Sequence, residues 1–404
     1  MAKILISSLG TGRKAEGSYS KAQYELNEKI YETTFIADAL NQHLDFDKIF
    51  LVGTKKSIWD EAYMVFGGED EKYLEELYEK KESGDINELF LKKFKNTTSS
   101  GLELIIINYG LNNEELWDNF SEFLNIAKNI EDEDELYLDI THSFRSLALM
   151  SFVMAQFAHT ISNKNFKIKG VFYGMFEYQG ENNGITPIVD IKILIEIQEW
   201  IKAIDAIKNY SDFNPLVKLF DENKIEEDVK KTFINLNNTI SLANIASIRQ
   251  FINTASKKIR TIENSENKII KLLAPEILLL VEELDQERES DFQFTLAKWF
   301  YKNKNYALSY IALYEAIITK SCELSKYDIN NHNLREKAKG SIGDDKYGKY
   351  FYTKYQDSIS VIRNDIVHQS NNRKQLVASD IQKLKKFIEF FEDYFKIGNN
   401  KKVR

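Results

Sequence analysis

The spacing of hydrophobic and polar positions changes about halfway along the chain. In the first 190 residues, short apolar runs alternate with longer segments in which apolar residues recur at helical spacing. Nearly continuous apolar runs are typical of strands that are buried on both faces of a sheet. These runs predict strands at Lys3–Ser8, Lys48–Gly53, Leu102–Asn108, Glu135–Thr141 and Ile168–Phe176.

The segments between these runs predict helices. Such alternation is typical of a mostly parallel sheet with helices on both faces, a Rossmann-like arrangement. Weak alternation over Tyr19–Ile30 indicates a hairpin inserted after the first strand. The expected helices are Thr34–Leu44, Ser57–Phe66, Glu71–Lys81, Asn113–Ile130 and Phe144–Ser162.

From Ile191 to the end of the chain the pattern is helical throughout. The expected fold class is therefore α/β plus all-α: a Rossmann-like domain over residues 1–195, followed by a helical region over residues 196–404. Within that region, residues 200–290 belong either to the terminal bundle or to a helical spacer, and the pattern leaves both open.

Bulk composition adds limits. A chain of 404 residues is too long for one ordinary core, which agrees with two domains. No apolar run approaches the length of a membrane span, and the first ten residues suit a strand better than a signal peptide. Cys322 is the single cysteine, which excludes an intrachain disulfide and a cysteine-based zinc site. We expect a cytoplasmic protein with no membrane partner.

Charge is distributed unevenly. Residues 1–200 hold 20 Lys and Arg against 34 Asp and Glu, a net charge of −14, whereas residues 201–404 hold 34 against 28, a net charge of +6. An acidic front half and a mildly basic rear half suit a protein that contacts a polyanion only with its rear half.

The rear half contains the sharpest chemical motif, Arg363-Asn364-Asp365-Ile366-Val367-His368. On a helix, Asn364 and His368 lie one above the other, and Arg363 projects from the same turn. An imidazole titrates near neutral pH and can serve as general acid or base. A guanidinium can hold a phosphate and offset the charge of the transition state. The bland alternative is a surface arginine and a capped or buried histidine on an ordinary helix.

These three groups suit RNA cleavage. The attacking group is the 2′-hydroxyl of the substrate itself, which DNA lacks, so the expected ends are a 2′,3′-cyclic phosphate and a 5′-hydroxyl. The rear half shows no cluster of Asp, Glu and His with metal-ligand spacing, so we expect neither a metal nor a cofactor.

Two front segments follow expected strands. The first, Ser7 to Gly12, places Ser8, Gly10, Thr11 and Gly12 in a turn whose backbone N–H groups can approach a phosphate. Gly10-x-Gly12-x-x-Ala15 also satisfies a loose dinucleotide fingerprint. A nicotinamide dehydrogenase fits poorly, because no acidic residue ends the strand that finishes at Gly53. A tight strand-end turn without a ligand is the plain alternative.

The second front segment, Asp139 to Arg145, ends one strand and begins the next helix. Anionic ligands bind at such positions in α/β sheets. Thr141 and Ser143 can cap the helix, and His142 and Arg145 can meet phosphates or base edges. A capping turn with an incidental histidine is the alternative.

Both ends of the chain resemble one known family. Arg-Asn-x-x-x-His resembles the catalytic motif of HEPN ribonucleases, which assigns catalysis to Arg363, Asn364 and His368. Leu9-Gly10-Thr11-Gly12, Tyr31-Glu32-Thr33-Thr34-Phe35 and Asp139-x-Thr141-His142-Ser143-Phe144-Arg145 resemble the CARF domains of type III CRISPR ancillary proteins. Residues 200–300 contribute no specific motif.

This resemblance implies an antiviral ribonuclease that works as a homodimer. A cyclic oligoadenylate activator, cyclic tetra-adenylate favoured over cyclic hexa-adenylate, would bind Ser8, Gly10, Thr11, Gly12, Thr141, His142, Ser143 and Arg145. The substrate would be single-stranded RNA. Two alternatives stay open: a non-catalytic sensor whose helical half binds a partner, and an enzyme that degrades the activator in its front domain.

Overall fold

The computed structural model describes residues 1–12, 14–15, 18–97, 101–142, 145–161, 164–341, 355–368 and 378–396. The chain divides into two compact units, Met1–Glu196 and Ile197–Arg404. The first is an α/β unit and the second is helical, which confirms the expected fold class.

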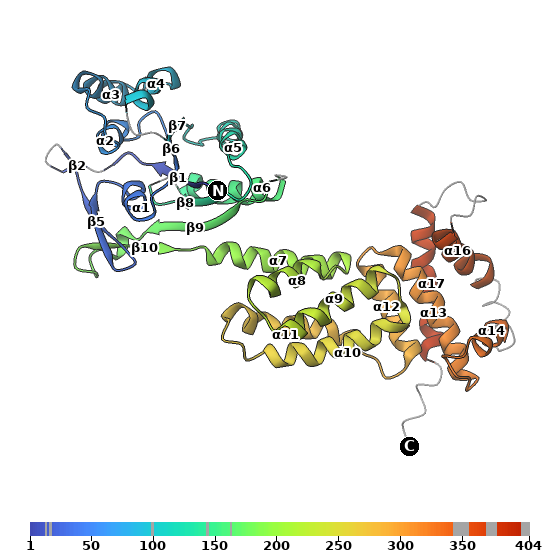
Figure 1. Ribbon diagram of the computed structural model, residues 1–404. Coiled ribbons are helices and arrows are strands. Elements are labelled where there is room, and N and C mark those ends of the chain that lie inside the picture. The colour runs from blue at the N-terminus through green and yellow to red at the C-terminus, as the bar shows by residue number, and fades with distance from the viewer. Residues whose placement is uncertain are drawn as a thin grey trace. The chain divides into compact units, whose positions relative to one another are not determined.

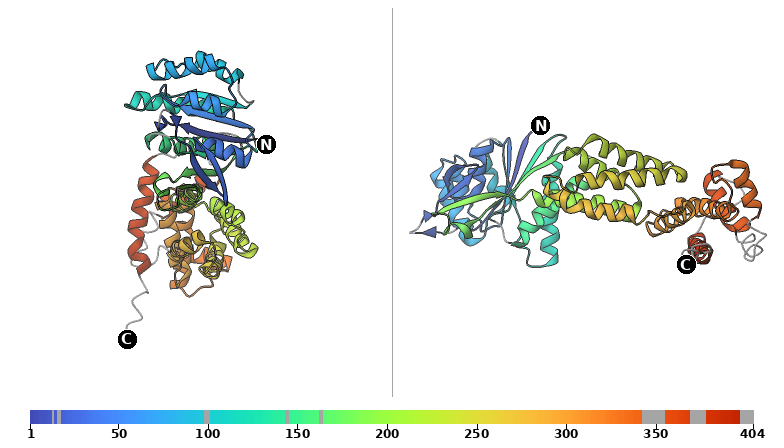
Figure 2. Two further views of the ribbon diagram at one scale, coloured as in Figure 1. Left: turned by 90° about the vertical axis from the view of Figure 1, so that its left-hand side faces the viewer. Right: turned by 90° about the horizontal axis from the view of Figure 1, so that it is seen from below.

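The first unit contains an eight-stranded sheet in the order β5-β4-β10-β9-β8-β1-β6-β7. The strands β9, β8, β1, β6 and β7 are parallel to one another, β10 is antiparallel to β9, and β4 and β5 form a hairpin. The strands fan out across the sheet (Figure 2). Their bounds are β1 Lys3–Leu9, β4 Ala22–Leu26, β5 Lys29–Thr33, β6 Lys48–Gly53, β7 Leu102–Ile106, β8 Glu135–Asp139, β9 Lys167–Gly174 and β10 Ile185–Asp190.

Two layers of helices cover this sheet (Figure 1). Alternate residues of β1 supply the two cores: Leu5 and Leu9 pack with the first layer, and Ile4 and Ile6 pack with the second. The first layer is α1 Ile36–Leu44, α2 Trp59–Val65, α3 Glu71–Ser83 and α4 Glu88–Thr97, and the second is α5 Asn113–Lys128 and α6 Arg145–Ile161. The short 3-10 helix η1, Phe176–Tyr178, follows β9.

The five expected strands and five expected helices of this unit are all present, with bounds shifted by up to two residues. Two elements were missed. The strand β10 contains Pro187, which lowers strand propensity, and α4 is rich in lysine, which masked its apolar face. A separate two-stranded ribbon, β2 Lys14–Ala15 with β3 Ser18–Tyr19, follows the first loop.

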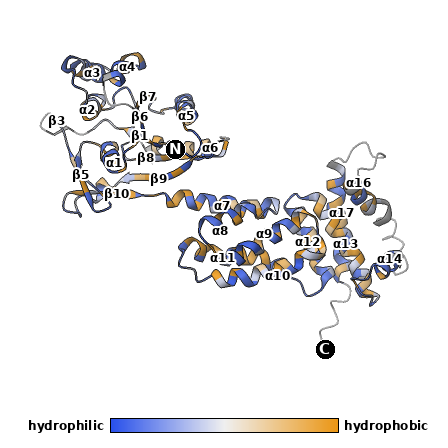
Figure 3. Ribbon diagram, in the orientation of Figure 1, coloured by the Kyte–Doolittle hydropathy of each residue, from blue (hydrophilic) through white to orange (hydrophobic). Residues whose placement is uncertain are grey.

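The second unit is built around one continuous hydrophobic cluster, which runs from Trp200 to Phe395. Residues 200–290 and the later helices therefore contribute to the same core. Hydrophobic and hydrophilic residues mix along these helices, as expected for amphipathic helices that bury one face (Figure 3). The elements are α7 Ile193–Tyr210, α8 Asn214–Glu222, α9 Glu227–Ser241, α10 Ile245–Ile262, α11 Lys268–Glu282, α12 Glu289–Lys302, α13 Tyr306–Leu324, α14 His332–Ser341, the π-helix η2 Tyr355–Ser360, α16 Val361–His368 and α17 Ala378–Lys396.

A buried lysine on α13 contacts the C-terminal end of the last helix, α17. Lys320 of α13 is fully buried, and its Nζ donates to the carbonyl oxygen of Phe395 at 3.1 Å. The ring of Phe395 stacks on Phe294 of α12 with a centroid separation of 4.1 Å. A cation at the C-terminal end of a helix is favoured by the helix dipole, so Lys320 joins α13 and α17 electrostatically as well as by packing. In the part of the chain that the structure describes, no helix has the length and apolar character needed to cross a membrane.

The β4–β5 turn allows a stability test. Asn27 and Glu28 have φ values of 50° and 65°, so the turn uses the left-handed conformation twice. In this conformation the Cβ atom of glutamate comes too close to the following carbonyl oxygen, whereas glycine has no Cβ atom. We expect Glu28→Gly to raise the free energy of unfolding of the front unit by about 0.5–1 kcal/mol in urea denaturation. Glu32→Gly, an exposed position within β5, serves as the control and should lower it; a decrease for both variants would contradict the turn assignment.

Candidate functional site

The carboxyl edge of the sheet holds the polar loops of the front unit. The next strand along the chain that pairs with β1 is β6, on one side of it, whereas the later strand β8 pairs with β1 on the other side. The loops that follow β1 and β8 therefore diverge, which is the topological switch point where ligands bind in such sheets. A cavity of about 140 Å³ opens at this point.

Four of the predicted activator-binding residues line this cavity. Ser8, Gly10 and Thr11 come from the end of β1 and its loop, and His142 comes from the loop after β8. Ser8 is buried and Thr11 is exposed. The remaining wall is formed by Leu9, Val52, Gly53, Thr54, Ser57, Ile107 and Leu147.

Close backbone contacts explain both glycines of the first loop. A Cβ atom on Gly10 would lie 2.7 Å from the carbonyl oxygen of His142, so only glycine lets the two loops touch. Gly12 has a φ of +71°, and a Cβ there would lie 2.7 Å from both the Tyr19 ring and the Ile58 side chain. The N–H of Ile58 donates to the carbonyl oxygen of Gly10 at 2.9 Å, which fixes the loop from the other side.

Asp139, the last residue of β8, holds the loop that follows this strand through hydrogen bonds. Its carboxylate accepts hydrogen bonds from the Ser7 hydroxyl at 2.5 Å and from the Thr141 N–H at 2.9 Å. Burial raises the pKa of Asp139 to about 6. The Thr141 hydroxyl accepts from the N–H of Gly174 at 2.9 Å, so Thr141 holds the loop against β9.

His142 presents a neutral imidazole to the site. Burial lowers the pKa of His142 to about 4. Its Nε2 lies 3.3 Å from the Tyr24 hydroxyl, and its ring lies beside Phe176 with a centroid separation of 5.4 Å. At neutral pH, His142 can therefore act as a hydrogen-bond donor or acceptor but not as a cation.

Two of the other predicted front residues lie wholly or partly outside the described part of the structure. Ser143 lies outside the described residues, and Arg145 is the first residue of α6 with a side chain that is also outside them. Ser7 and Tyr24 were not assigned by sequence reasoning. Ser7 stands only one residue before the assigned loop, but nothing in the sequence relates Tyr24 to a residue 118 positions away.

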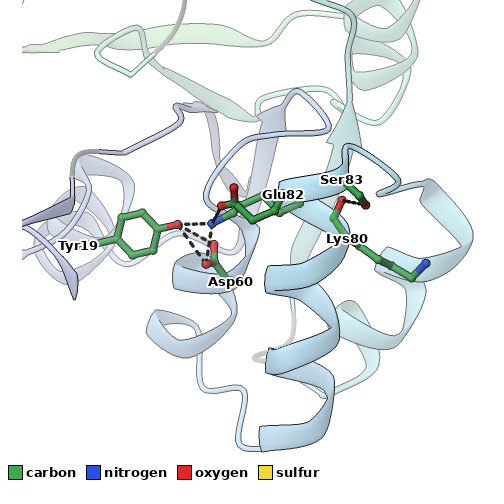
Figure 4. A network of polar contacts seen from close by, with 6 residues as sticks. Tyr19, Asp60, Lys80, Glu82 and Ser83 are labelled. Carbon is green, nitrogen blue, oxygen red and sulfur yellow. Dashed lines mark hydrogen bonds and ion pairs between the residues drawn. The ribbon is translucent and has the colours of Figure 1, made fainter. Parts of the chain in front are cut away.

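A buried polar cluster anchors the segment after the first loop (Figure 4). The hydroxyl of Tyr19 accepts from Lys81 Nζ at 2.5 Å and donates to the Asp60 carboxylate at 3.1 Å, while Lys81 also pairs with Asp60 at 2.9 Å. Burial raises the pKa of Tyr19 to about 12, so the phenol stays protonated. Because the Tyr19 ring packs on Gly12, this cluster supports the loop that lines the cavity.

The rear motif lies on α16. Ile359 and Ile362 are buried, and Ile366 packs against the same core, as the spacing predicted. Arg363 is half-buried, and its Nη1 donates to Oδ1 of the exposed Asn364 at 3.1 Å. His368 is the last residue of α16, and its side chain is outside the described part of the structure. The three catalytic assignments therefore stay predictions.

Among the residues that the structure describes, no group of three or more His, Cys, Asp and Glu side chains is arranged to hold a metal ion.

The order of the strands and the polar loops at the switch point define a Rossmann-like domain, a class in which ligands bind outside the carboxyl ends of the strands. Residues 4–177 match the family model for the CARF domain of the CRISPR system endoribonuclease Csx1. Residues 196–289 match the model for the second domain of the CRISPR-associated protein MJ1674. Both models end before α16.

The CRISPR-associated protein MJ1674 of Methanocaldococcus jannaschii is 31% identical over 409 residues, which cover 93% of this chain and 63% of that protein. Enterococcus italicus Csm6 bound to cyclic hexa-2′-fluoro-hexa-dAMP is similar with a TM-score of 0.40 and 12% identity, over 98% of this chain and 93% of that one. Residues 4–177 thus form a domain similar to the CARF domains of type III CRISPR ancillary proteins, which confirms the family resemblance of the front loops, and the chain spans less than two thirds of the length of its relative MJ1674.

The buried Lys81–Asp60 pair gives a stability prediction. Lys81→Met leaves the Asp60 carboxylate buried with only a hydroxyl partner, and uncompensated buried charges cost about 3–5 kcal/mol. We expect a loss of that size in the free energy of unfolding of the front unit, measured by urea denaturation. Lys72→Met, an exposed position on the same helix, is the matched control and should change it by less than about 0.5 kcal/mol. Equal effects of the two variants would show that the pair contributes nothing specific.

Asp139 and His142 give opposite pH dependences. The raised pKa of Asp139 favours the folded state at low pH, and this contribution is lost as the pH rises from about 4 through 6. The lowered pKa of His142 gives a contribution that is present above about 6.5 and lost as the pH falls through about 4.

Asp139→Asn therefore removes one of two opposed dependences. Between pH 4 and 6, the unfolding free energy of the wild type should fall relative to that of the variant, by at most about 3 kcal/mol. Urea titrations of both proteins at several pH values measure this difference. Parallel curves across the window would mean that Asp139 titrates normally in the folded state.

Proposed function

We propose that the chain is a cyclic-oligoadenylate-activated, metal-independent endoribonuclease of type III CRISPR antiviral defence, which acts in the cytoplasm. It cleaves single-stranded RNA and leaves 2′,3′-cyclic phosphate and 5′-hydroxyl ends. The observation that carries this proposal is the cavity at the switch point of a CARF-family domain, lined by Gly10, Thr11 and His142.

The front site suits a nucleotide anion. Gly10 and Gly12 carry no side chains, so the backbone N–H groups at these two positions of the first loop can approach phosphate oxygens. His142 is neutral and partly buried, which suits contact with a base or ribose better than with a phosphate charge. Cyclic tetra-adenylate is the activator that we would test first, and cyclic hexa-adenylate the second.

In the rear unit, Arg363 and Asn364 supply the groups that hold a phosphate. The Asn364 carboxamide accepts from one guanidinium nitrogen and so orients the fork that meets the phosphate oxygens. His368 takes the proton of the 2′-hydroxyl as this oxygen attacks phosphorus. The P–O5′ bond then breaks, and the leaving oxygen receives a proton from the His368 imidazolium of the second chain of the proposed homodimer.

Regulation requires two states of the protein that differ in affinity for the activator. We propose that the chain is a homodimer in which the activator favours the state with the two α16 helices placed for cleavage. The basic rear half agrees with an RNA strand bound at the rear, whereas the acidic front half can bind a small anion only through local backbone donors.

Cleavage of labelled single-stranded RNA by the full chain tests this proposal. With EDTA present, cyclic tetra-adenylate should raise the rate, and the fragments should carry 2′,3′-cyclic phosphates. His368→Ala should lower the activated rate at least 100-fold, the usual contribution of general acid–base catalysis. His332→Ala, an exposed histidine of the same unit, is the control and should keep full activity. Gly12→Ala should require more activator for half-maximal cleavage, because a Cβ would collide with Tyr19 and Ile58.

Two outcomes would overturn the proposal. Activated cleavage that survives His368→Ala would remove the catalytic assignment. Binding of the activator to the wild type with no RNA cleavage would favour the sensor without catalytic activity. A third measurement incubates labelled activator with His368→Ala protein. A linear product would show that the front unit degrades the activator.

A further inference from the structure

The outer and inner sides of the Arg363 guanidinium differ in their hydrogen-bond partners. A guanidinium has five N–H donors in one plane. On the outer side, Nη1 donates to the exposed Asn364. On the inner side, Nε is buried and has no hydrogen-bond partner among the described residues. An unpaired buried donor costs free energy, so some other contact must offset it.

The ring of Tyr314 on α13 supplies that contact. The Cζ atom of Arg363 lies 5.0 Å from the centroid of this ring, within the range of a cation–π interaction. Tyr314 is only 8% exposed, so the interaction is formed in a largely dry environment, where it is strongest. The ring therefore attracts the inner part of the guanidinium, while its outer edge stays at the surface beside Asn364.

Tyr314 is itself held by a third helix. The Nζ of Lys339 on α14 lies 5.9 Å from the centroid of the Tyr314 ring. Burial would lower the pKa of Lys339, but its hydrogen bond and charge interactions with Tyr314, together with the nearby Glu336, outweigh burial and raise it. Lys339 pairs only loosely with Glu336, at 3.7 Å. The Tyr314 ring thus lies near two cations that come from separate helices.

We propose that Tyr314 is a positioning residue of the ribonuclease site, whose ring fixes the Arg363 guanidinium and lies beside Lys339 of α14. This inference rests on the ribonuclease function proposed above. It adds α13 and α14 to a site that sequence spacing confined to α16.

Positioning matters here because a flexible arginine loses rotamer freedom when it binds a phosphate. A guanidinium that is already fixed by a ring has lost part of that freedom before the substrate arrives. Its planar fork is then presented in one orientation, as bidentate contact with phosphate oxygens requires. A lysine at position 363 offers neither the planar fork nor the stacking on the ring.

The test compares three substitutions in the activated full chain. Tyr314→Phe keeps the ring and should stay within about 3-fold of the wild-type kcat/KM for RNA. Tyr314→Leu removes the ring and should lower kcat/KM about 10-fold, which corresponds to 1.4 kcal/mol and lies within the range for a desolvated cation–π contact.

Tyr310→Leu is the matched control, because Tyr310 is a buried tyrosine one turn earlier on α13 whose hydroxyl donates to Asp380. At a temperature where all variants are folded, it should stay within about 3-fold of the wild type. An equal loss for Tyr310→Leu and Tyr314→Leu, or a loss below 2-fold for Tyr314→Leu, would overturn the positioning role.

A second measurement does not depend on cleavage. The buried Nε proton of Arg363 is protected from exchange with water, so its ¹⁵N–¹H signal is observable in arginine-labelled full chain and is assigned by its loss in Arg363→Lys. The Tyr314 ring current should displace this signal in the wild type and in Tyr314→Phe, and the displacement should vanish in Tyr314→Leu. An unchanged signal in Tyr314→Leu would overturn the inference, whereas a wild type that never cleaves RNA would overturn the proposed function.

Discussion

The front unit depends on how closely two loop backbones approach at the switch point of its sheet. Gly10 faces the carbonyl oxygen of His142 at a distance that no Cβ could occupy. From this contact follow the position of the cavity, the need for glycine after β1, and the placement of His142 between the loop and the β4 strand that carries Tyr24. A side chain at position 10 would separate the loops and open the cavity into a shallow surface.

The front unit buries several polar groups, and their hydrogen bonds explain why they are tolerated. Asp139 accepts hydrogen bonds from Ser7 and Thr141, and Lys81 donates to Asp60 and Tyr19, so these two buried charged groups both have hydrogen-bond partners. Partnered groups of this kind add little net stability but impose one arrangement, since removing either partner leaves a costly buried charge. The loops are thereby held in one shape before any ligand binds.

The sequence predicted the elements that depend on local patterns, but it did not predict the contacts between distant residues. The strands β1, β6 and β8 were predictable because burial on both faces makes them continuous apolar runs, and the loop glycines because turns after such strands demand them. The residues that support the loops were not predictable. Tyr19, Tyr24 and Lys81 come from other elements and carry no motif, and only the folded chain brings them to the site. Tyr314 was missed for the same reason, because it stands 49 positions before Arg363.

The chemistry proposed for α16 bears on the number of chains that a complete site needs. Cleavage through the 2′-hydroxyl requires a group that takes a proton and another that gives one, on opposite sides of the phosphorus. One α16 supplies one imidazole, from His368, and an imidazole cannot be protonated and unprotonated at once. A guanidinium is a hydrogen-bond donor with no acceptor capacity, so an arginine cannot take the proton of the 2′-hydroxyl. Two copies of α16 facing one phosphate would supply both protonation states, which is the physical reason for proposing a dimer and for expecting a single chain to be nearly inert.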